Sequence, residues 1–170
     1  MPNYIFNPQG DRPIQSVELD FLESPKNDRF LLKLGTYIAD GINYSYRKHY
    51  GNEIAIREII DYDAVNIDIS RFPLLKLYRQ TDNYSQKSVG TTKAIIAYCL
   101  TYPEQDRLPG LMQYMSKAID IMLDTYYYKH EDCQPNVVLE ERSAEYRIQV
   151  NEITNAIYPF LRFNFSFTEQ

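Results

Sequence analysis

The sequence has no tryptophan, only two histidines and only two cysteines among 170 residues. Small secreted domains compensate for a small core with several disulfides, so two cysteines argue against such a scaffold. No apolar run approaches the roughly 20 residues that a membrane-spanning helix needs, and no signal-peptide pattern opens the chain. These absences favour a protein of the reducing cytoplasm that has no membrane partner.

Groups suited to catalysis are also scarce. Histidine is the side chain best matched to acid–base work at neutral pH, but His49 follows two basic residues at an expected helix end, where cations stabilise the helix dipole. His130 lies near Asp132 and Cys133 without the paired ligand spacing of zinc sites. The GxSxG, HExxH and GxGxxG patterns are absent. We therefore expect no enzymatic activity, no metal site and no cofactor.

Acidic residues outnumber basic ones by 23 to 18, which gives a net charge of −5 and a pI near 5.1. This balance does not suit a tight hold on a nucleic-acid backbone, which needs clustered cations. The aromatic residues are mainly tyrosines, 16 against 8 phenylalanines. Tyrosine can bury its ring with its hydroxyl in water and is enriched at protein interfaces. A tyrosine-rich edge of the core and a surface for protein partners are both open interpretations.

The length suits one domain. Residues 1–24 contain three prolines and a glycine, and we expect them to form an extended N-terminal arm. Residues 25–170 are expected to form a single α+β domain.

Two helices are expected at the start of this domain. Ser24 and Pro25 are typical of a helix start, and the apolar spacing from Asn27 to His49 has the helical period. Gly41 predicts a bend or break in this helix. A second, shorter helix is expected over residues 53–60.

The second half of the chain predicts strands on both sides of one helix. Residues 74–78 form a short apolar run, and residues 91–101 form a continuous one that is typical of a central strand. An amphipathic helix with three methionines on its apolar stripe follows over residues 111–123, and we assign that stripe to the core. Strands are expected at 137–139 and 146–150, and Phe163, Phe165 and Phe167 predict a last strand with one aromatic face. The predicted fold is N-terminal helices followed by a β-β-α-β-β unit, with the long helix packed on a largely antiparallel sheet.

Part of this pattern resembles the tail terminator proteins of tailed bacteriophages. The matching features are the run Phe72-Pro73-Leu74-Leu75-Lys76-Leu77-Tyr78-Arg79, the polar loop after it, the strand 93–100, the acidic turn 103–108, the helix 111–127 and the aromatic strand 160–167. They cover a little over half of the chain and consist of element order and hydrophobic positions rather than an invariant motif.

The resemblance implies a non-enzymatic virion subunit of the tail or neck, assembled in the host cytoplasm. Such proteins form a homo-oligomeric ring, commonly a hexamer, that ends the tail tube and joins it to the head connector. The implied partners are the tail tube, the sheath where the tail contracts, and the neck proteins. DNA only passes through the channel.

The polar loop 80–88 is the candidate contact with the tube or a neighbouring subunit, because Tyr84 lies there among polar residues, as in many binding loops. A hairpin tip without a partner is the alternative. With the acidic turn, the candidate interface residues are Gln80, Asp82, Asn83, Tyr84, Gln86, Lys87, Glu104, Asp106 and Arg107.

Other functions remain open at this point. Residues 1–71 are longer than a minimal terminator needs, which leaves room for a neck adaptor. A metal-dependent enzyme acting on nucleic acid would use Glu140, Asp132 or His130 as ligands. A small module that binds one partner through its tyrosines is a third possibility.

Overall fold

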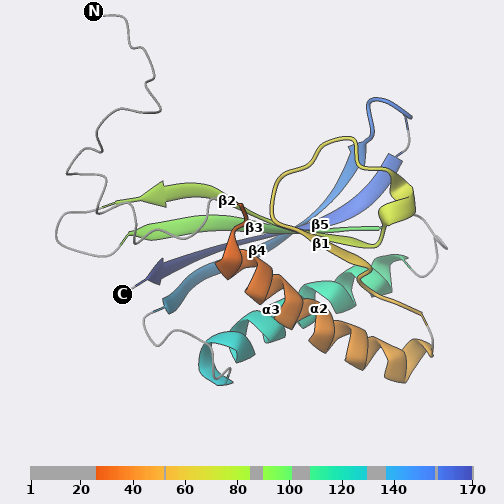
Figure 1. The fold of residues 1–170 in the computed structure, drawn as a ribbon. Coiled ribbons are helices and arrows are strands. Elements are labelled where there is room, and N and C mark those ends of the chain that lie inside the picture. Colours follow the sequence, from red (N-terminus) through yellow and green to blue (C-terminus); the bar gives the residue numbers. More distant parts are fainter. Residues whose placement is uncertain are drawn as a thin grey trace, which may run out of the picture.

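The computed structural model describes residues 26–51, 53–84, 90–100, 108–129, 137–155 and 157–169. These residues form an α+β fold in which one mixed sheet of five strands carries two long helices on one face (Figure 1). In chain order the elements are α2 (Arg29–Tyr50), β1 (Glu58–Ile60), the 3-10 helix η1 (Ile69–Arg71), β2 (Leu74–Asn83), β3 (Thr91–Cys99), α3 (Leu108–Lys129), β4 (Val137–Val150) and β5 (Ile157–Glu169). The arm expected at residues 1–24 lies outside the described residues.

The strand order in the sheet is β1-β2-β3-β5-β4. β1 runs parallel to β2, and the other three neighbouring pairs are antiparallel. β3 is therefore the middle strand, and seven consecutive residues from Ala94 to Leu100 are buried. The continuous apolar run in the sequence predicted this central position, and the structure confirms it.

The main core lies between the sheet and the two helices. α3 contributes Met112, Met115 and Ile119, which are buried, and β5 contributes Phe163 and Phe167. Burying a side chain of this size stabilises the fold by about 1.5–3 kcal/mol. The predictions that the methionine stripe and the alternating phenylalanines belong to the core are both confirmed.

Asp28 caps the start of α2, where its carboxylate accepts a hydrogen bond from the backbone N–H of Leu31 at 3.2 Å, and Gly51, which has a φ of 67°, caps the end of the helix. Such a cap satisfies one of the free N–H groups at a helix start. The start expected at residues 24–25 is wrong for this helix, because residues 26–28 precede it and Asp28 is its cap. The helix is continuous through Gly41, so the predicted break there is wrong. Met122 of α3 packs against that position so closely that a Cβ atom would clash with it.

The second helix expected at residues 53–60 is also wrong. The chain there is extended and ends in β1, which pairs with residues 74–76 of β2. The side-chain amide of Asn43 in α2 both donates to the carbonyl of Ile56 and accepts from its N–H, each at 2.9 Å. These bonds satisfy the backbone of Ile56 in the extended conformation. Isoleucines spaced by one to three residues fit a helix and a strand alike, and tertiary contacts decide between them.

The face of the sheet away from the helices is divided into two halves. Residues 61–73, including η1, cross over one half (Figure 1) and enclose a smaller core around Phe72, Ile95 and Tyr158. We call residues 61–73 the crossing segment. The rings of Phe72 and Tyr158 meet edge to face with centroids 4.9 Å apart. The other half of this face is lined mainly by polar side chains, and it forms the basis of the candidate site.

Candidate functional site

Four of the residues that the sequence singles out lie at the end of β2 or directly after it: Gln80, Asp82 and Asn83 in the strand, and Tyr84 next to it. With the start of β3, this end reaches past the helices (Figure 1), and all four side chains are exposed. Tyr84 is 87% exposed. The neighbouring strand β3 orients the Asp82 side chain, because the Thr92 hydroxyl donates to its carboxylate at 2.6 Å. These four side chains are therefore accessible to another molecule, and their role as an interface stays a prediction.

Arg79 fixes this strand end to the rest of the molecule. Its Nε donates to the Asp28 carboxylate at the start of α2 at 2.6 Å, and its Nη1 donates to Asp82 at 3.3 Å. Its guanidinium lies 5.8 Å from the ring centroid of Phe167 in β5. A planar guanidinium suits such simultaneous ion pairing and ring contact. Sequence reasoning missed this junction, because Asp28 and Arg79 are separated by 51 positions.

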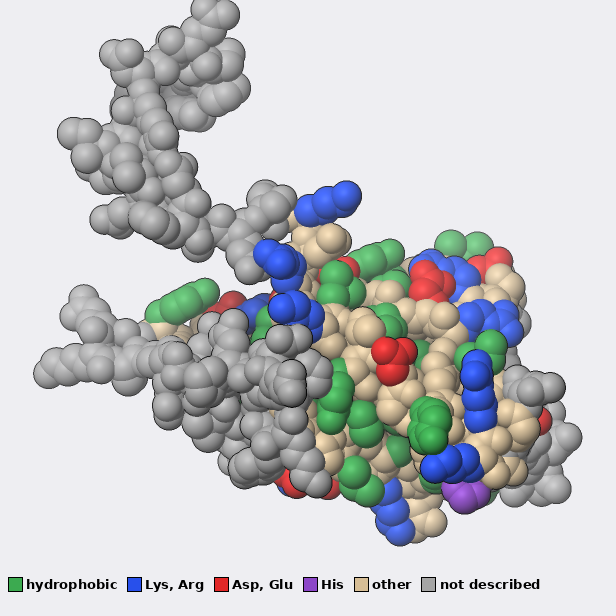
Figure 2. All heavy atoms as spheres, turned by 60° about the horizontal axis from the view of Figure 1, so that its bottom comes forward, with side chains coloured by type: hydrophobic (Ala, Val, Ile, Leu, Met, Phe, Trp, Pro, Cys, Tyr) green, Lys and Arg blue, Asp and Glu red, His purple; other side chains and the backbone are tan. Residues whose placement is uncertain are grey.

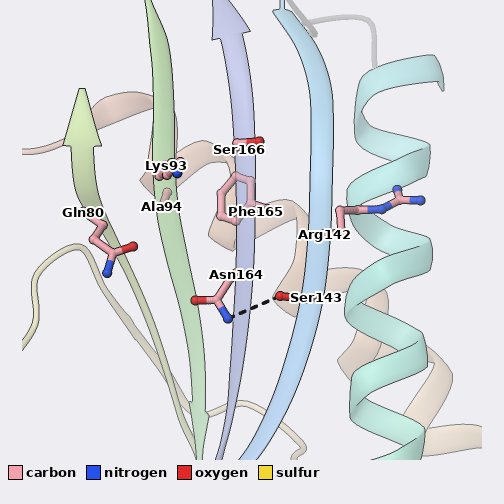
Figure 3. A pocket seen from close by; sticks show the side chains of 8 residues that line it. All are labelled: Gln80, Lys93, Ala94, Arg142, Ser143, Asn164, Phe165 and Ser166. Carbon is pink, nitrogen blue, oxygen red and sulfur yellow. Dashed lines mark hydrogen bonds between the residues drawn. The ribbon is translucent and has the colours of Figure 1, made fainter. Parts of the chain in front are cut away.

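A β-bulge directs Gln80 toward the polar half of the sheet. The register between β2 and β3 shifts between Arg79 and Thr81, and such a shift re-aims the side chain at the bulge. Gln80 borders a shallow hollow of about 450 Å³ (Figure 3). The residues that line it come from β2, β3, β4 and β5: Gln80, Lys93, Ala94, Arg142, Ser143, Asn164, Phe165 and Ser166.

Side chains of β4 and β5 form a chain of hydrogen bonds beside this hollow. Asn164 donates to the Ser143 hydroxyl at 3.5 Å, as Figure 3 shows, and to Glu145 at 3.4 Å. Arg162 Nε donates to the Asn164 side-chain carbonyl at 3.1 Å, and Arg147 Nε donates to Glu145 at 2.8 Å. This network holds donors and acceptors in fixed directions on an accessible surface, a property that a partner protein can match.

The sequence predicts the polar face of β5 by its alternation, but it does not predict which side chain meets which across the strands. Arg142 is an example of a side chain whose contacts the sequence does not predict. It lines the hollow, but it also forms ion pairs with Asp120 and Asp124 of α3, at 2.9 and 3.1 Å. A register shift between Leu139 and Arg142 precedes it in β4.

The side chains that line the hollow supply hydrogen-bond donors and acceptors and one aromatic ring, Phe165. His49 lies exposed in the last turn of α2 together with two basic residues, as predicted. Burial raises the pKa of the Cys99 thiol to about 11, so this thiol stays protonated and unreactive at neutral pH. Within the described ranges, no three His, Cys, Asp or Glu side chains come together in a way that could hold a metal ion.

Several predicted residues lie outside the described part of the chain. They are the interface candidates Gln86, Lys87, Glu104, Asp106 and Arg107, the candidate metal ligands His130 and Asp132, and Cys133. Glu140, the third candidate ligand, belongs to β4.

The helical face mixes apolar side chains with scattered charges (Figure 2). Tyrosines here join the two helices. Tyr37 of α2 donates to Thr125 of α3, and Tyr114 of α3 donates to Ser45 of α2, each at 3.0 Å. Other tyrosines, Tyr84 among them, are exposed. Tyr37 and Tyr114 fit the interpretation of a tyrosine-rich edge of the core, while a surface for protein partners stays a prediction.

No protein-family model matches the chain, and no curated protein matches its sequence at a significant level. Within the described part of the chain, neither α2 nor α3 is long and apolar enough to span a membrane.

Proposed function

We propose that this protein is a structural subunit of a phage virion, a tail terminator that forms a hexameric ring, caps the tail tube and joins it to the head connector or neck. The observation that carries the proposal is the end of β2, which extends beyond the helices (Figure 1) and is followed directly by the exposed Tyr84. Exposed tyrosine is a frequent anchor of protein interfaces. The polar hollow next to it offers oriented donors and acceptors for a second protein surface.

Two further features support the proposal. The succession β2, β3, α3, β4, β5 follows the element order on which the resemblance to tail terminators rests. The acidic balance of the chain suits a channel through which DNA passes without binding, since phosphates are repelled by carboxylates. In this function the protein acts through its assembly into a ring, with partners on both faces of the ring and DNA moving through its centre.

Electron microscopy of purified tail tubes incubated with the protein tests the proposal. We expect density of a closed ring at one end of the tube and no further growth of the capped tube. Ring density at the head connector with none on the tube would reassign the protein to the neck. A protein that binds neither tubes nor connectors would refute the proposal.

Tyr84→Ala tests the anchoring role of the β2 end. We expect fewer capped tubes, because truncating an interface tyrosine often costs about 2 kcal/mol or more in binding. Tyr62→Ala is the matched control, since Tyr62 is also exposed but lies in the crossing segment. Equal capping by the two variants would exclude the β2 end from the contact.

A further inference from the structure

The outer edge of the sheet offers a second binding surface. β4 is an edge strand of 14 residues, and no other described strand pairs with its outer side. Its last part exposes apolar side chains: Tyr146 is 59% exposed, Ile148 is 66% exposed, and Val150 is also exposed. Tyr146 lies opposite Leu161 of β5, on the helix side of the sheet. The helices leave this part of that side uncovered.

An edge of this kind favours pairing with another strand. The outer side of an edge strand presents backbone N–H and C=O groups that another strand can bond. Edge strands that stay single usually carry charges or prolines that oppose pairing. Residues 146–150 of β4 contain no proline and one charge, that of Arg147, and they alternate apolar with polar or charged side chains, with the apolar ones exposed. Pairing would therefore also remove apolar surface from water.

The charges on the other side of β4 indicate what the partner is. Glu145 and Arg147 flank Tyr146 and carry opposite charges. When two antiparallel copies of β4 meet with their Tyr146 residues opposite each other, Glu145 of each copy lies opposite Arg147 of the other. In the same register, Ala144 of each copy lies opposite Ile148 of the other. The strand is thus complementary to itself in both charge and apolar contacts.

A head-to-tail arrangement, in which β4 of one copy pairs with β1 of the next, offers fewer backbone hydrogen bonds. The other edge strand of the described sheet is β1, which has only three residues. We therefore propose that two copies of the free protein associate about a twofold axis at Tyr146, through antiparallel pairing of β4 with β4, and form one continuous sheet. The proposal concerns the free protein in solution and does not depend on the terminator function.

Two charge reversals test the pairing. In Glu145→Arg, positive charges face each other across the axis, and in Arg147→Glu, negative charges do. We expect each variant alone to show a dimer dissociation constant raised about tenfold or more. A mixture of the two restores complementary charges across the axis. We expect it to form a one-to-one heterodimer with an affinity close to that of the wild type.

Analytical ultracentrifugation and native mass spectrometry make these measurements, and circular dichroism verifies that each variant is folded. Lys117→Glu is the control, since Lys117 lies exposed on α3, and it should dimerise like the wild type. Wild-type protein that stays monomeric up to its solubility limit overturns the proposal. Single variants that dimerise like the wild type, or a mixture that does not pair, also overturn it. A monomeric protein that still caps tail tubes would refute the pairing and leave the terminator function standing.

Discussion

Lys76 places a charged amine in the smaller core of the sheet. The residue is 4% exposed, its Nζ donates to the Asp63 carboxylate at 3.1 Å, and it lies 3.3 Å from the carbonyl oxygen of Ala64. Asp63 belongs to the crossing segment and remains half exposed. The ion pair therefore joins this segment to β2 with one partner in water and one partner buried. The buried ammonium depends on its carboxylate far more than the carboxylate depends on the ammonium.

This asymmetry predicts unequal effects of two substitutions. Asp63→Asn leaves the ammonium buried without a counter-charge and should lower the free energy of unfolding by about 1–3 kcal/mol. Lys76→Met keeps most of the apolar stem and removes the charge, so it should lower the free energy of unfolding by less than Asp63→Asn does. Urea denaturation of both variants measures the difference. A larger loss in Lys76→Met would show that the amine itself stabilises the fold.

Buried acidic groups predict a loss of stability at high pH. Burial raises the pKa of Cys99 to about 11 and that of Tyr158 to about 12. Both groups are neutral in the folded protein, while in the unfolded chain they lose their protons near pH 9 and 10. The unfolded state therefore binds fewer protons than the folded state, and the free energy of unfolding falls as pH rises from about 9 to 12.

Urea denaturation at a series of pH values checks this fall. In Cys99→Ala, the part of the decline between about pH 9 and 11 should be shallower, because the thiol no longer contributes. The comparison uses the slope of stability against pH, so the cavity left by the smaller side chain does not affect it. Identical slopes for both proteins would contradict a raised thiol pKa.

At the scale of elements, α2 depends on two glycines for its close approach to its neighbours. A Cβ at Gly35 would lie 2.7 Å from Leu77 Cδ1 and 3.0 Å from Ile59 Cγ2, and one at Gly41 would meet the thioether end of Met122. Leu77 is fully buried in the sheet, while Met122 is only partly buried. Methionine adapts its shape readily. The two sites therefore differ in how much their neighbours can move.

We expect Gly35→Ala to destabilise the protein by about 1–3 kcal/mol, because overpacking against Leu77 outweighs the gain in helix propensity. Gly41→Ala should change the free energy of unfolding by less than about 1 kcal/mol, since Met122 can turn aside and alanine favours the helix. Thermal or urea denaturation compares the two. Equal losses would mean that Met122 is as tightly held as Leu77.

At the scale of the whole molecule, the sheet is covered by helices on one face and by the crossing segment on half of the other. β3 and β5 lie inside the sheet, whereas β1 is a short edge strand. Native-state hydrogen exchange should show the slowest amides in β3 and β5, which exchange by global unfolding. Amides of β1 should exchange through smaller openings, with a lower free energy. Equal protection across the sheet would show that β1 opens only with the whole fold.

The sequence contains the parts of the fold that depend on local periodicity. The unbroken apolar run of β3, the alternating phenylalanines of β5 and the methionine stripe of α3 each predict their element and its buried side. For residues 53–60 the sequence predicts the wrong element, because their isoleucines fit a helix and a strand alike. The hydrogen bonds of Asn43 in α2 to the backbone of Ile56 stabilise the extended form. The glycines of α2 predict a bend when read alone, and only the positions of Leu77 and Met122 explain them.

The same distinction applies to the candidate site. Composition and turn chemistry predict an exposed surface at Gln80–Tyr84, since polar residues cluster there. The details of this surface depend on contacts between neighbouring strands. These are the register shift at Gln80, the hydrogen bond from Thr92 to Asp82 and the network around Asn164. Such pairings depend on register, which a single sequence does not specify beyond its hydrophobic pattern.

The contacts of Arg79 affect how the end of β2 responds to force. Arg79 ties the far end of β2 to the first turn of α2 through Asp28, and to β5 through the ring of Phe167. A force that bends the end of β2 at Asp82 and Asn83 must also strain the Arg79–Asp28 ion pair and the contact with the Phe167 ring. A load applied to this strand end is therefore shared with α2 and with β5.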